Sequence, residues 1–317
     1  MNRKLYLLAK LLVSIGLLAI LTRQIDGGAV LAAFARVPNG VLAEAFLVIL
    51  AQFAVAAIRW LLLGRLTGAS LSIWQTFRLF FAAMFFNQLL PTSLGGDAVR
   101  AWLASRQGLP IGRAANTVIL DRSAGLISLL ILMLVTGVLM ADRMPNPAIA
   151  DIVRYVPPVI LLTAILSLIF ANRVAGLIDR FIWCRPIASL LRDSSVLWRA
   201  GPISVAVLGL SLTLHMMTAT CVWLLANGVG AIVGFPEIVG LLPPTILMMI
   251  LPISIAGWGV REGVLVGLFA LLGVAAAPAL AISLMWGGLT LIAALLGGLI
   301  WVMTSAPEAT PVEPNSG

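Results

Sequence analysis

Long apolar segments alternate with short polar loops along almost the whole chain. Nine apolar runs are predicted as helices, at residues 5–22, 41–63, 73–90, 116–140, 155–171, 203–226, 238–256, 260–275 and 279–303. A helix needs about 20 apolar residues to cross the ~30 Å hydrocarbon core of a bilayer. The pattern therefore predicts an all-α, polytopic membrane helix bundle with about seven or eight transmembrane helices.

Two of these runs are interrupted. The run 73–90 contains Arg78 and Asn87 and stops at Pro91, and the run 238–256 contains Pro243-Pro244 and Pro252. Irregular backbone at membrane depth survives only where protein or water satisfies its polar groups. We therefore predict that both runs are broken, re-entrant segments rather than full crossings.

Composition supports the membrane assignment. The 317 residues are 61% hydrophobic and only 10% charged, and the mean hydropathy is +1.10. A water-soluble domain has roughly a quarter of its residues charged, so this chain has too few charges to cover a soluble surface. We interpret residues 5–22 as a retained first helix, because no small-residue cleavage site follows them. The tail 305–317, rich in Pro, Glu and Ser, is predicted to be disordered.

The net charge of +8 points to lipid rather than to nucleic acid. Arginines gather at the ends of apolar runs and in short loops, as the positive-inside rule describes. Anionic lipid headgroups are the partners that such charge favours.

Loop charges also orient the chain. Arg3 and Lys4 place the N-terminus in the cytoplasm, and five arginines mark the loop 172–200 as cytoplasmic. Both flanks of the run 73–90 carry arginines as well, so a segment that dips into the bilayer and returns is the simplest solution. After Arg199 the only Lys or Arg is Arg261, so the sidedness of the late loops and of the tail stays open.

A short motif occurs twice. Residues 90–100 read LPTSLGGDAVR and residues 251–261 read LPISIAGWGVR, with Leu, Pro, Ser, Gly, Val and Arg shared at the same positions. Each copy closes an interrupted run, and paired broken segments in corresponding halves are the best sequence pointer to a transport site. We predict one membrane domain over residues 1–304 with an inverted repeat, its halves at about 1–140 and 155–304. Alternatively, each copy is an ordinary turn at the membrane surface.

The motifs supply candidate residues for binding an anionic headgroup. In the first copy, Gly95 and Gly96 permit unusual backbone conformations, Asp97 is expected to be a helix N-cap, and Arg100 is suited to grip a phosphate. Plain capping and a positive-inside anchor are the alternatives for Asp97 and Arg100. In the second copy, Gly257 and Gly259 give flexibility and Arg261-Glu262 gives charge.

Further charges lie in or near the ends of apolar runs. Arg78, Asp121 and Arg122 are functional candidates by default, since ionisable side chains are costly in a membrane. Together with Arg100 they are expected to line one basic cavity that opens to the cytoplasm. Arg59 is interpreted as a residue that snorkels to the interface. His215 is expected to make a hydrogen bond between helices.

Several functions lack support in the sequence. Cys184 and Cys221 are not placed to pair, and the single histidine excludes a His/Cys metal cluster. No nucleophile elbow, nucleotide-binding loop or zinc-protease motif occurs, so no cofactor and no enzyme activity are predicted.

The stretch Asn87 to Arg100, with Asp121-Arg122 and the segment Leu251 to Glu262, resembles the lysylphosphatidylglycerol synthase transmembrane region, or flippase-like, family. The resemblance covers about residues 5–303, and its Gly-Gly-Asp-x-x-Arg and Gly-x-Gly-Val-Arg-Glu motifs are fairly specific. It implies movement of a phospholipid, or of a polyprenyl- or hopanoid-type lipid, between the leaflets of the bacterial inner membrane. The full-length factors of this family carry a soluble aminoacyl-transferase domain, which does not follow Met303 here. Lipid aminoacylation is therefore not implied.

Two other functions stay open. The first is a non-transporting scaffold for lipid-modifying enzymes. The second is an intramembrane enzyme that acts on a lipid phosphate. The lipid, the direction and energy source of transport and the oligomeric state do not follow from the sequence.

Overall fold

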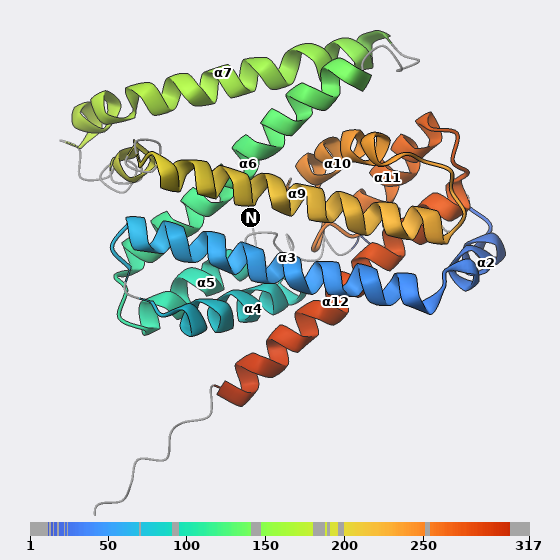
Figure 1. Cartoon of the computed structure of the whole chain (residues 1–317), viewed down its shortest axis with the longest axis horizontal. Coiled ribbons are helices and arrows are strands. Elements are labelled where there is room, and N and C mark those ends of the chain that lie inside the picture. The colour runs from blue at the N-terminus through green and yellow to red at the C-terminus, as the bar shows by residue number, and fades with distance from the viewer. Residues whose placement is uncertain are drawn as a thin grey trace, which may run out of the picture.

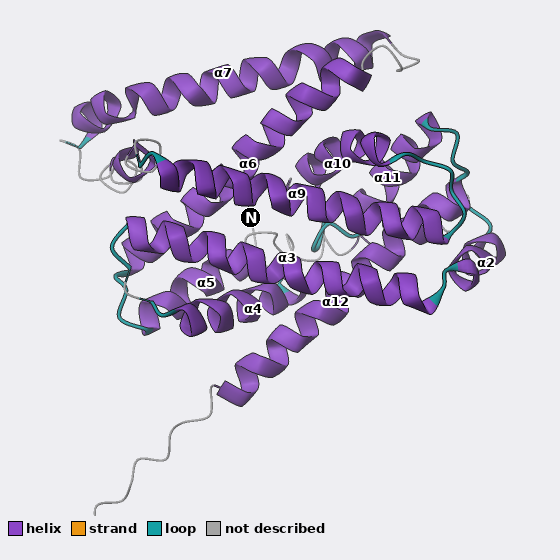
Figure 2. Ribbon diagram, viewed as in Figure 1, coloured by secondary structure: helices purple, strands orange, loops and turns teal. Residues whose placement is uncertain are grey.

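The computed structural model describes residues 25–69, 71–90, 95–140, 147–179, 191–195, 200–250 and 254–304, with Ala188 and single positions between 12 and 23. Every element in these ranges is a helix (Figures 1 and 2), which confirms the predicted all-α membrane bundle. Most of the predicted first helix and the whole tail 305–317 lie outside the described residues.

Ten helices have bounds within the described residues. They are α2 (Gly27–Arg36), α3 (Asn39–Leu66), α4 (Ile73–Leu89), α5 (Gly95–Arg106), α6 (Ile111–Met140), α7 (Pro147–Ile178), α9 (Pro202–Gly228), α10 (Phe235–Ile250), α11 (Val260–Leu271) and α12 (Ala276–Thr304). Among the described residues, four helices are long and apolar enough to cross a membrane: α3, α6, α9 and α12.

The order of the helices repeats. The series α3, α4, α5 and α6 has 28, 17, 12 and 30 residues, and the series α9, α10, α11 and α12 has 27, 16, 12 and 29. The contacts between the two series are also equivalent. The second helix of each series packs against the last helix of the other, α4 against α12 and α10 against α6. The short sequence motif therefore marks one point of a repeat that extends over four helices on each side of α7.

The two central counterparts, α3 and α9, run antiparallel and side by side (Figure 1). Gln52 Nε2 donates to the Leu214 carbonyl at 3.1 Å and to Thr218 Oγ1 at 2.6 Å. Seven residues further along α3, Arg59 Nη1 donates to Ser211 Oγ at 3.0 Å. The later residue of α3 therefore contacts an earlier residue of α9, as expected for antiparallel helices. The counterpart helices α3 and α9 therefore run in opposite directions, and the inverted orientation of the two halves in a bilayer stays a prediction.

Each series contains a hairpin of two short helices. α4 packs against α5, and α10 packs against α11. Residues 91–94 and 251–253, which lie between these helices in the sequence, are outside the described residues. The two copies of the sequence motif, residues 90–100 and 251–261, therefore end within α5 and α11.

The expected break at Pro243-Pro244 is wrong. Both prolines lie inside α10, which continues from residue 235 to 250. Proline removes a backbone donor, but membrane helices tolerate it where neighbouring groups satisfy the freed carbonyls. The interruption of the second hairpin therefore comes after residue 250.

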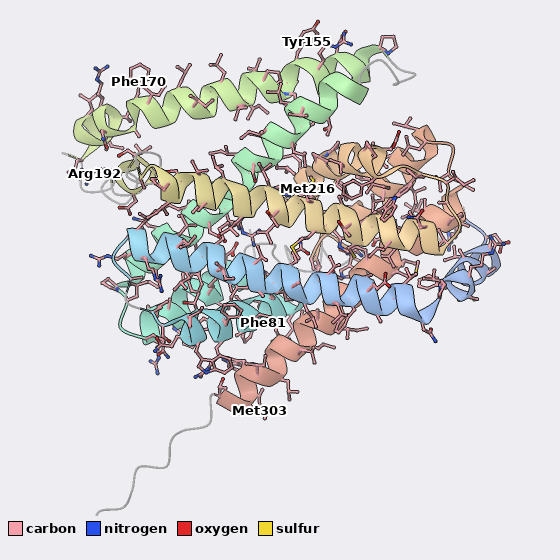
Figure 3. The ribbon with its side chains drawn as sticks, viewed as in Figure 1. Phe81, Tyr155, Phe170, Arg192, Met216 and Met303 are labelled. Atoms are coloured by element: carbon pink, nitrogen blue, oxygen red, sulfur yellow. The ribbon has the colours of Figure 1, made fainter. Side chains whose placement is uncertain are left out.

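The distribution of side chains is the reverse of that in a soluble protein. Large apolar side chains point outward, and Tyr155 and Phe170 on α7 are examples that are 60% and 43% exposed (Figure 3). Charged side chains of α3, α5, α6 and α11 are buried inside. Lipid, rather than water, is the solvent that suits such a surface.

Glycines let α4 and α12 approach closely. A Cβ atom on Gly297 would lie 2.1 Å from the Phe81 carbonyl oxygen, and one on Gly298 would lie 2.6 Å from a ring carbon of Phe85. Small residues that allow backbones to touch are a main source of helix association in membranes.

We expect Gly297→Val to separate α4 from α12 and to lower the free energy of unfolding by about 1–3 kcal/mol, since the extra carbons meet backbone that cannot yield. Gly288→Val is the matched control on the same helix, because a Cβ there meets no atom within 4 Å. Thermal unfolding of both variants in detergent is the measurement. Equal unfolding temperatures would contradict this packing.

Candidate functional site

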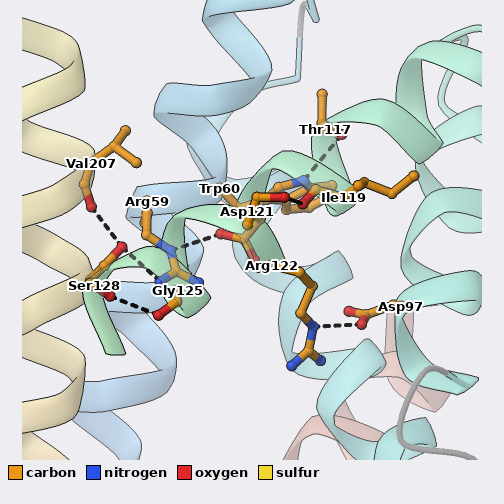
Figure 4. Close-up of polar contacts among 12 residues, drawn as sticks. Arg59, Trp60, Asp97, Thr117, Ile119, Asp121, Arg122, Gly125, Ser128 and Val207 are labelled. Carbon is orange, nitrogen blue, oxygen red and sulfur yellow. Dashed lines mark hydrogen bonds and ion pairs between the residues drawn. The ribbon is translucent and has the colours of Figure 1, made fainter. Parts of the chain in front are cut away.

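Three helices of the first half bring five charged side chains together. They are Arg59 of α3, Asp97 and Arg100 of α5, and Asp121 and Arg122 of α6. Figure 4 shows part of this cluster, which we call the arginine network. The helix α6 is one of the four that are able to span a membrane, so the network lies beside a spanning segment.

The five side chains form one continuous chain of ion pairs. Arg59 Nε donates to Asp121 Oδ1 at 2.8 Å, and Arg100 Nη1 donates to Asp121 Oδ2 at 3.0 Å. Arg100 Nη2 then donates to Asp97 Oδ1 at 3.2 Å, and Arg122 Nε donates to Asp97 Oδ2 at 2.6 Å. Each carboxylate therefore binds two arginines, one on each oxygen.

Exposure falls steeply across the network. The side chain of Arg122 is 49% exposed, whereas those of Arg100 and Asp121 are 1% and 4% exposed. Burying charge is costly unless it is paired, and the four buried members are all paired. The network therefore has one accessible end, at Arg122, and leads inward to Arg59.

Arg100 lies at the centre of the network in an aromatic cage. Its guanidinium carbon is 4.9 Å from the ring centre of Trp60 and 5.2 Å from that of Phe80. Such contacts stabilise a cation, most strongly where water is excluded. Arg100 Nε is the one buried side-chain nitrogen or oxygen without a hydrogen-bond partner in the described ranges. Buried donors are rarely left unpaired, so this one is a candidate ligand contact.

Asp97 and the two preceding glycines differ from the expectation. Asp97 lies within the first turn of α5, which begins at Gly95, so it is not the N-cap, and its carboxylate holds Arg100 and Arg122 instead. Neither glycine has a positive φ. Their role is close approach: a Cβ on Gly96 would lie 2.2 Å from the carbonyl oxygen of Ala83.

The inner end of the network reaches α9. Arg59 is buried rather than snorkelling, because it pairs with Asp121 and donates to Ser211. Next to it, His215 Nε2 lies 3.1 Å from the Gly125 carbonyl oxygen. The expected interhelical hydrogen bond of His215 is confirmed.

The second hairpin has a smaller charged cluster, which we call the Arg261 pair. Arg261 Nε donates to Glu262 Oε1 at 2.9 Å, and Glu262 Oε2 accepts from the Gly259 backbone N–H at 2.6 Å. Both side chains are buried, and Ser283 of α12 lies within 3.3 Å of each. Adjacent residues rarely face each other on a helix, but here the glutamate folds back over the first turn of α11.

Glycine conformation matters in this second copy. Gly257 and Gly259 have φ values of +80° and +85°, which side chains with a Cβ rarely adopt. The sequence anticipated this flexibility at both glycines. Trp258 and Trp286 lie over Arg261 at 4.5 Å and 5.5 Å, as Trp60 and Phe80 lie over Arg100.

Arg78 is separate from the arginine network. Its Nη2 donates to the Thr304 carbonyl at the end of α12, at 3.1 Å. The structure thus brings Arg100, Asp121 and Arg122 together, as expected, and places Arg78 of α4 against the end of α12 instead. Sequence reasoning missed Trp60, Ser283 and Trp286 as parts of the two clusters, because none belongs to a charged or glycine-rich motif.

The fold and the buried charges define a class: a multi-pass helical membrane protein with paired hairpins, each carrying a buried arginine. The family model described as the lysylphosphatidylglycerol synthase TM region matches residues 7–298, so the chain belongs to that family. A relative described as a UPF0104 membrane protein, from Archaeoglobus fulgidus, is 29% identical over 112 residues. That match covers 35% of this chain and 34% of the archaeal protein. The chain is thus related to lipid-associated membrane proteins, and the likeness to the archaeal protein covers about a third of each.

Proposed function

We propose that the chain binds the phosphate-bearing headgroup of a lipid at the arginine network and moves that lipid between the leaflets of the bacterial inner membrane. The observation that carries the proposal is the half-exposed Arg122 linked through Asp97 to the buried Arg100. Arginine binds phosphate with two parallel hydrogen bonds. Because Arg122 is half exposed and Arg100 is buried, a headgroup would meet first Arg122 and then Arg100 as it entered.

The lengths of the hairpin helices support a re-entrant position. At 1.5 Å per residue, the 17 residues of α4 extend about 26 Å and the 12 residues of α5 about 18 Å. The hydrocarbon core is about 30 Å thick, so a hairpin of this size reaches into the bilayer and returns. With the N-terminus in the cytoplasm, the first hairpin enters from the cytoplasmic side and the inverted second hairpin from the other.

A small cavity is lined by Trp60, which covers Arg100, and by Thr76 and Thr117 among others. Its volume is about 10 Å³, which is room for about one water molecule. A headgroup is far larger. We therefore propose that transport requires α4 and α5 to move against α6, which would open the Asp97 ion pairs.

We propose binding and transport rather than bond-making chemistry. Both carboxylates of the network are occupied by arginines, whereas a general base needs a carboxylate that is able to take a proton from the substrate. The family description names a synthase, but the match lies in its transmembrane region. The predicted roles of Gly257, Arg261 and Glu262 in substrate binding stay predictions.

Reconstitution tests the proposal. Purified protein is placed in liposomes that contain a fluorescent phosphatidylglycerol, and a membrane-impermeant reductant then bleaches the outer leaflet. We expect the protected fraction to fall in proteoliposomes and not in protein-free liposomes. No change with any phospholipid, together with persistent co-purification of a lipid-modifying enzyme, would overturn transport in favour of the scaffold.

A further inference from the structure

The only histidine of the chain, His215, lies against the inner end of the arginine network. It belongs to α9, and its Nε2 lies 3.1 Å from both the Gly125 carbonyl oxygen and the Ser128 Oγ of α6. A carbonyl oxygen only accepts hydrogen bonds, so Nε2 carries the hydrogen. In the neutral ring the other nitrogen, Nδ1, is then an acceptor, and no hydrogen bond from a described residue occupies it. His215 therefore has a ring nitrogen that is able to take a proton.

A positive charge lies next to this histidine. Arg59 Nη1 donates to Ser211 Oγ, and Ser211 comes one helical turn before His215 on α9. On the side of α6, Arg59 Nη1 would lie 3.5 Å from a Cβ atom at Gly125, the residue whose carbonyl binds His215 (Figure 4). Arg59 and His215 thus contact the same residue of α6 and neighbouring turns of α9.

Other charges around α9 are few in the described ranges. The helices that pack against α9 are α3, α6, α10 and α12. Of these, α12 has no charged residue, and α10 has only Glu237, in its first turn. The buried carboxylate of α6 is Asp121, and both of its oxygens already bind arginines. Besides Arg59 and Asp121, the charged side chains of α3 and α6 are exposed: Glu44, Arg65, Arg113 and Arg122.

The buried charges of the network balance while His215 is neutral. Arg59 and Arg100 face Asp97 and Asp121, so two positive charges meet two negative ones. A proton on His215 would add a positive charge beside Arg59 that no further carboxylate of the network offsets. Like charges repel strongly where water is excluded. Protonation therefore favours an arrangement in which Arg59 and His215 lie further apart.

We infer that His215 is a proton-binding site that controls the opening of the arginine network. Histidine is the side chain that ordinarily changes its charge between about pH 5 and 8. A proton on His215 weakens the pairing of Arg59 with Asp121, and Asp121 also holds Arg100 of α5. The inference rests on the proposed function, because it supplies a trigger for the movement of α4 and α5 against α6 that transport requires.

Nuclear magnetic resonance reads the protonation of His215 directly. Because the chain has a single histidine, protein that carries no polyhistidine tag and is labelled with a heavy nitrogen isotope in histidine gives the signals of this ring alone. In detergent we expect hydrogen on Nε2 only at about pH 8, and on both ring nitrogens at about pH 5. A ring that stayed neutral, or stayed charged, throughout this range would overturn the inference.

Transport at matched pH tests the consequence. Phosphatidylglycerol keeps its charge over this range, so a change in its rate reports on the protein. With equal pH on both sides of the proteoliposomes, we expect wild-type transport to be about tenfold faster at about pH 5.5 than at about pH 8. His215→Gln retains an N–H for the Gly125 carbonyl but takes no proton, so its rate is expected to change by less than about twofold. Arg36→Gln removes an exposed charge at the end of α2 and is the matched control, expected to keep the wild-type pH dependence.

The outcomes separate this inference from the proposed function. Transport that was independent of pH in the wild type, or equally dependent on pH in His215→Gln, would overturn the inference and leave transport in place. A histidine that titrates as expected, in a protein that moves no lipid at any pH, would discard the proposed function and retain the proton site. The titration uses wild-type protein, so it decides even where His215→Gln does not fold.

Discussion

Replacing Asp121 with alanine is expected to lower the free energy of unfolding by about 3–5 kcal/mol, the cost of leaving buried charge without its partner. Asp121 is the only carboxylate bound to Arg59 in the described residues, and it also holds Arg100. Without it, Arg59 would lose that carboxylate, and Arg100 would have only Asp97, which it shares with Arg122. Thermal unfolding in detergent, monitored by fluorescence or size-exclusion recovery, measures the loss.

Two further variants make this result interpretable. Asp121→Asn keeps an acceptor of the same shape but no charge, so its loss is expected to be intermediate. Asp179→Ala removes a carboxylate that pairs with Arg192, and both of those side chains are more than 40% exposed. Exposed pairs contribute about 0–1 kcal/mol. If Asp121→Ala were as stable as Asp179→Ala, the arginine network would not be holding α3, α5 and α6 together.

Replacing Glu262 with alanine is the second large effect, again about 3–5 kcal/mol. Glu262 is fully buried and accepts hydrogen bonds from the Gly259 N–H, the Arg261 guanidinium and, more weakly, the Ser283 hydroxyl. Its loss would leave Arg261 with Ser283 and two indole rings, and the first turn of α11 without its cap. The unfolding temperature of the detergent-solubilised variant is the measurement.

Glu44→Ala is the control for this prediction, because Glu44 is an exposed glutamate on α3. Glu262→Gln retains an oxygen for the Gly259 N–H and is expected to lose less than the alanine variant. If the Glu262→Ala protein unfolded at the same temperature as the wild type, the stability of the second hairpin would not depend on the Arg261 pair.

Much of the fold could be predicted because apolar run length carries most of the information in a membrane protein. The runs 41–63, 116–140, 203–226 and 279–303 correspond to α3, α6, α9 and α12. The repeated motif pointed to the two pairs of short helices, α4 with α5 and α10 with α11. The prediction of a break at Pro243-Pro244 was wrong because a packed membrane helix tolerates a missing backbone donor. The sequence alone does not show which groups satisfy the freed carbonyls.

The site was predicted in part. Arg100, Asp121 and Arg122 were named because charge in an apolar run needs an explanation, and the structure places them together. Their connection through Asp97 and Arg59 could not be predicted, because Arg59 and Asp121 are 62 residues apart and meet only through the packing of α3 on α6. Gly96 was given the wrong role, since a flexible glycine and a tightly packed one look alike in sequence.

Loss of transport in Arg122→Gln is the most direct test of the claim that the arginine network carries a lipid headgroup. Losing a charge-assisted hydrogen bond of about 1.5–3 kcal/mol corresponds to a reduction of about ten- to a hundredfold. We expect that reduction in the rate of phosphatidylglycerol movement between the leaflets of proteoliposomes, with Arg36→Gln at the wild-type rate. Equal rates for the two variants, at equal amounts of folded protein, would contradict the account.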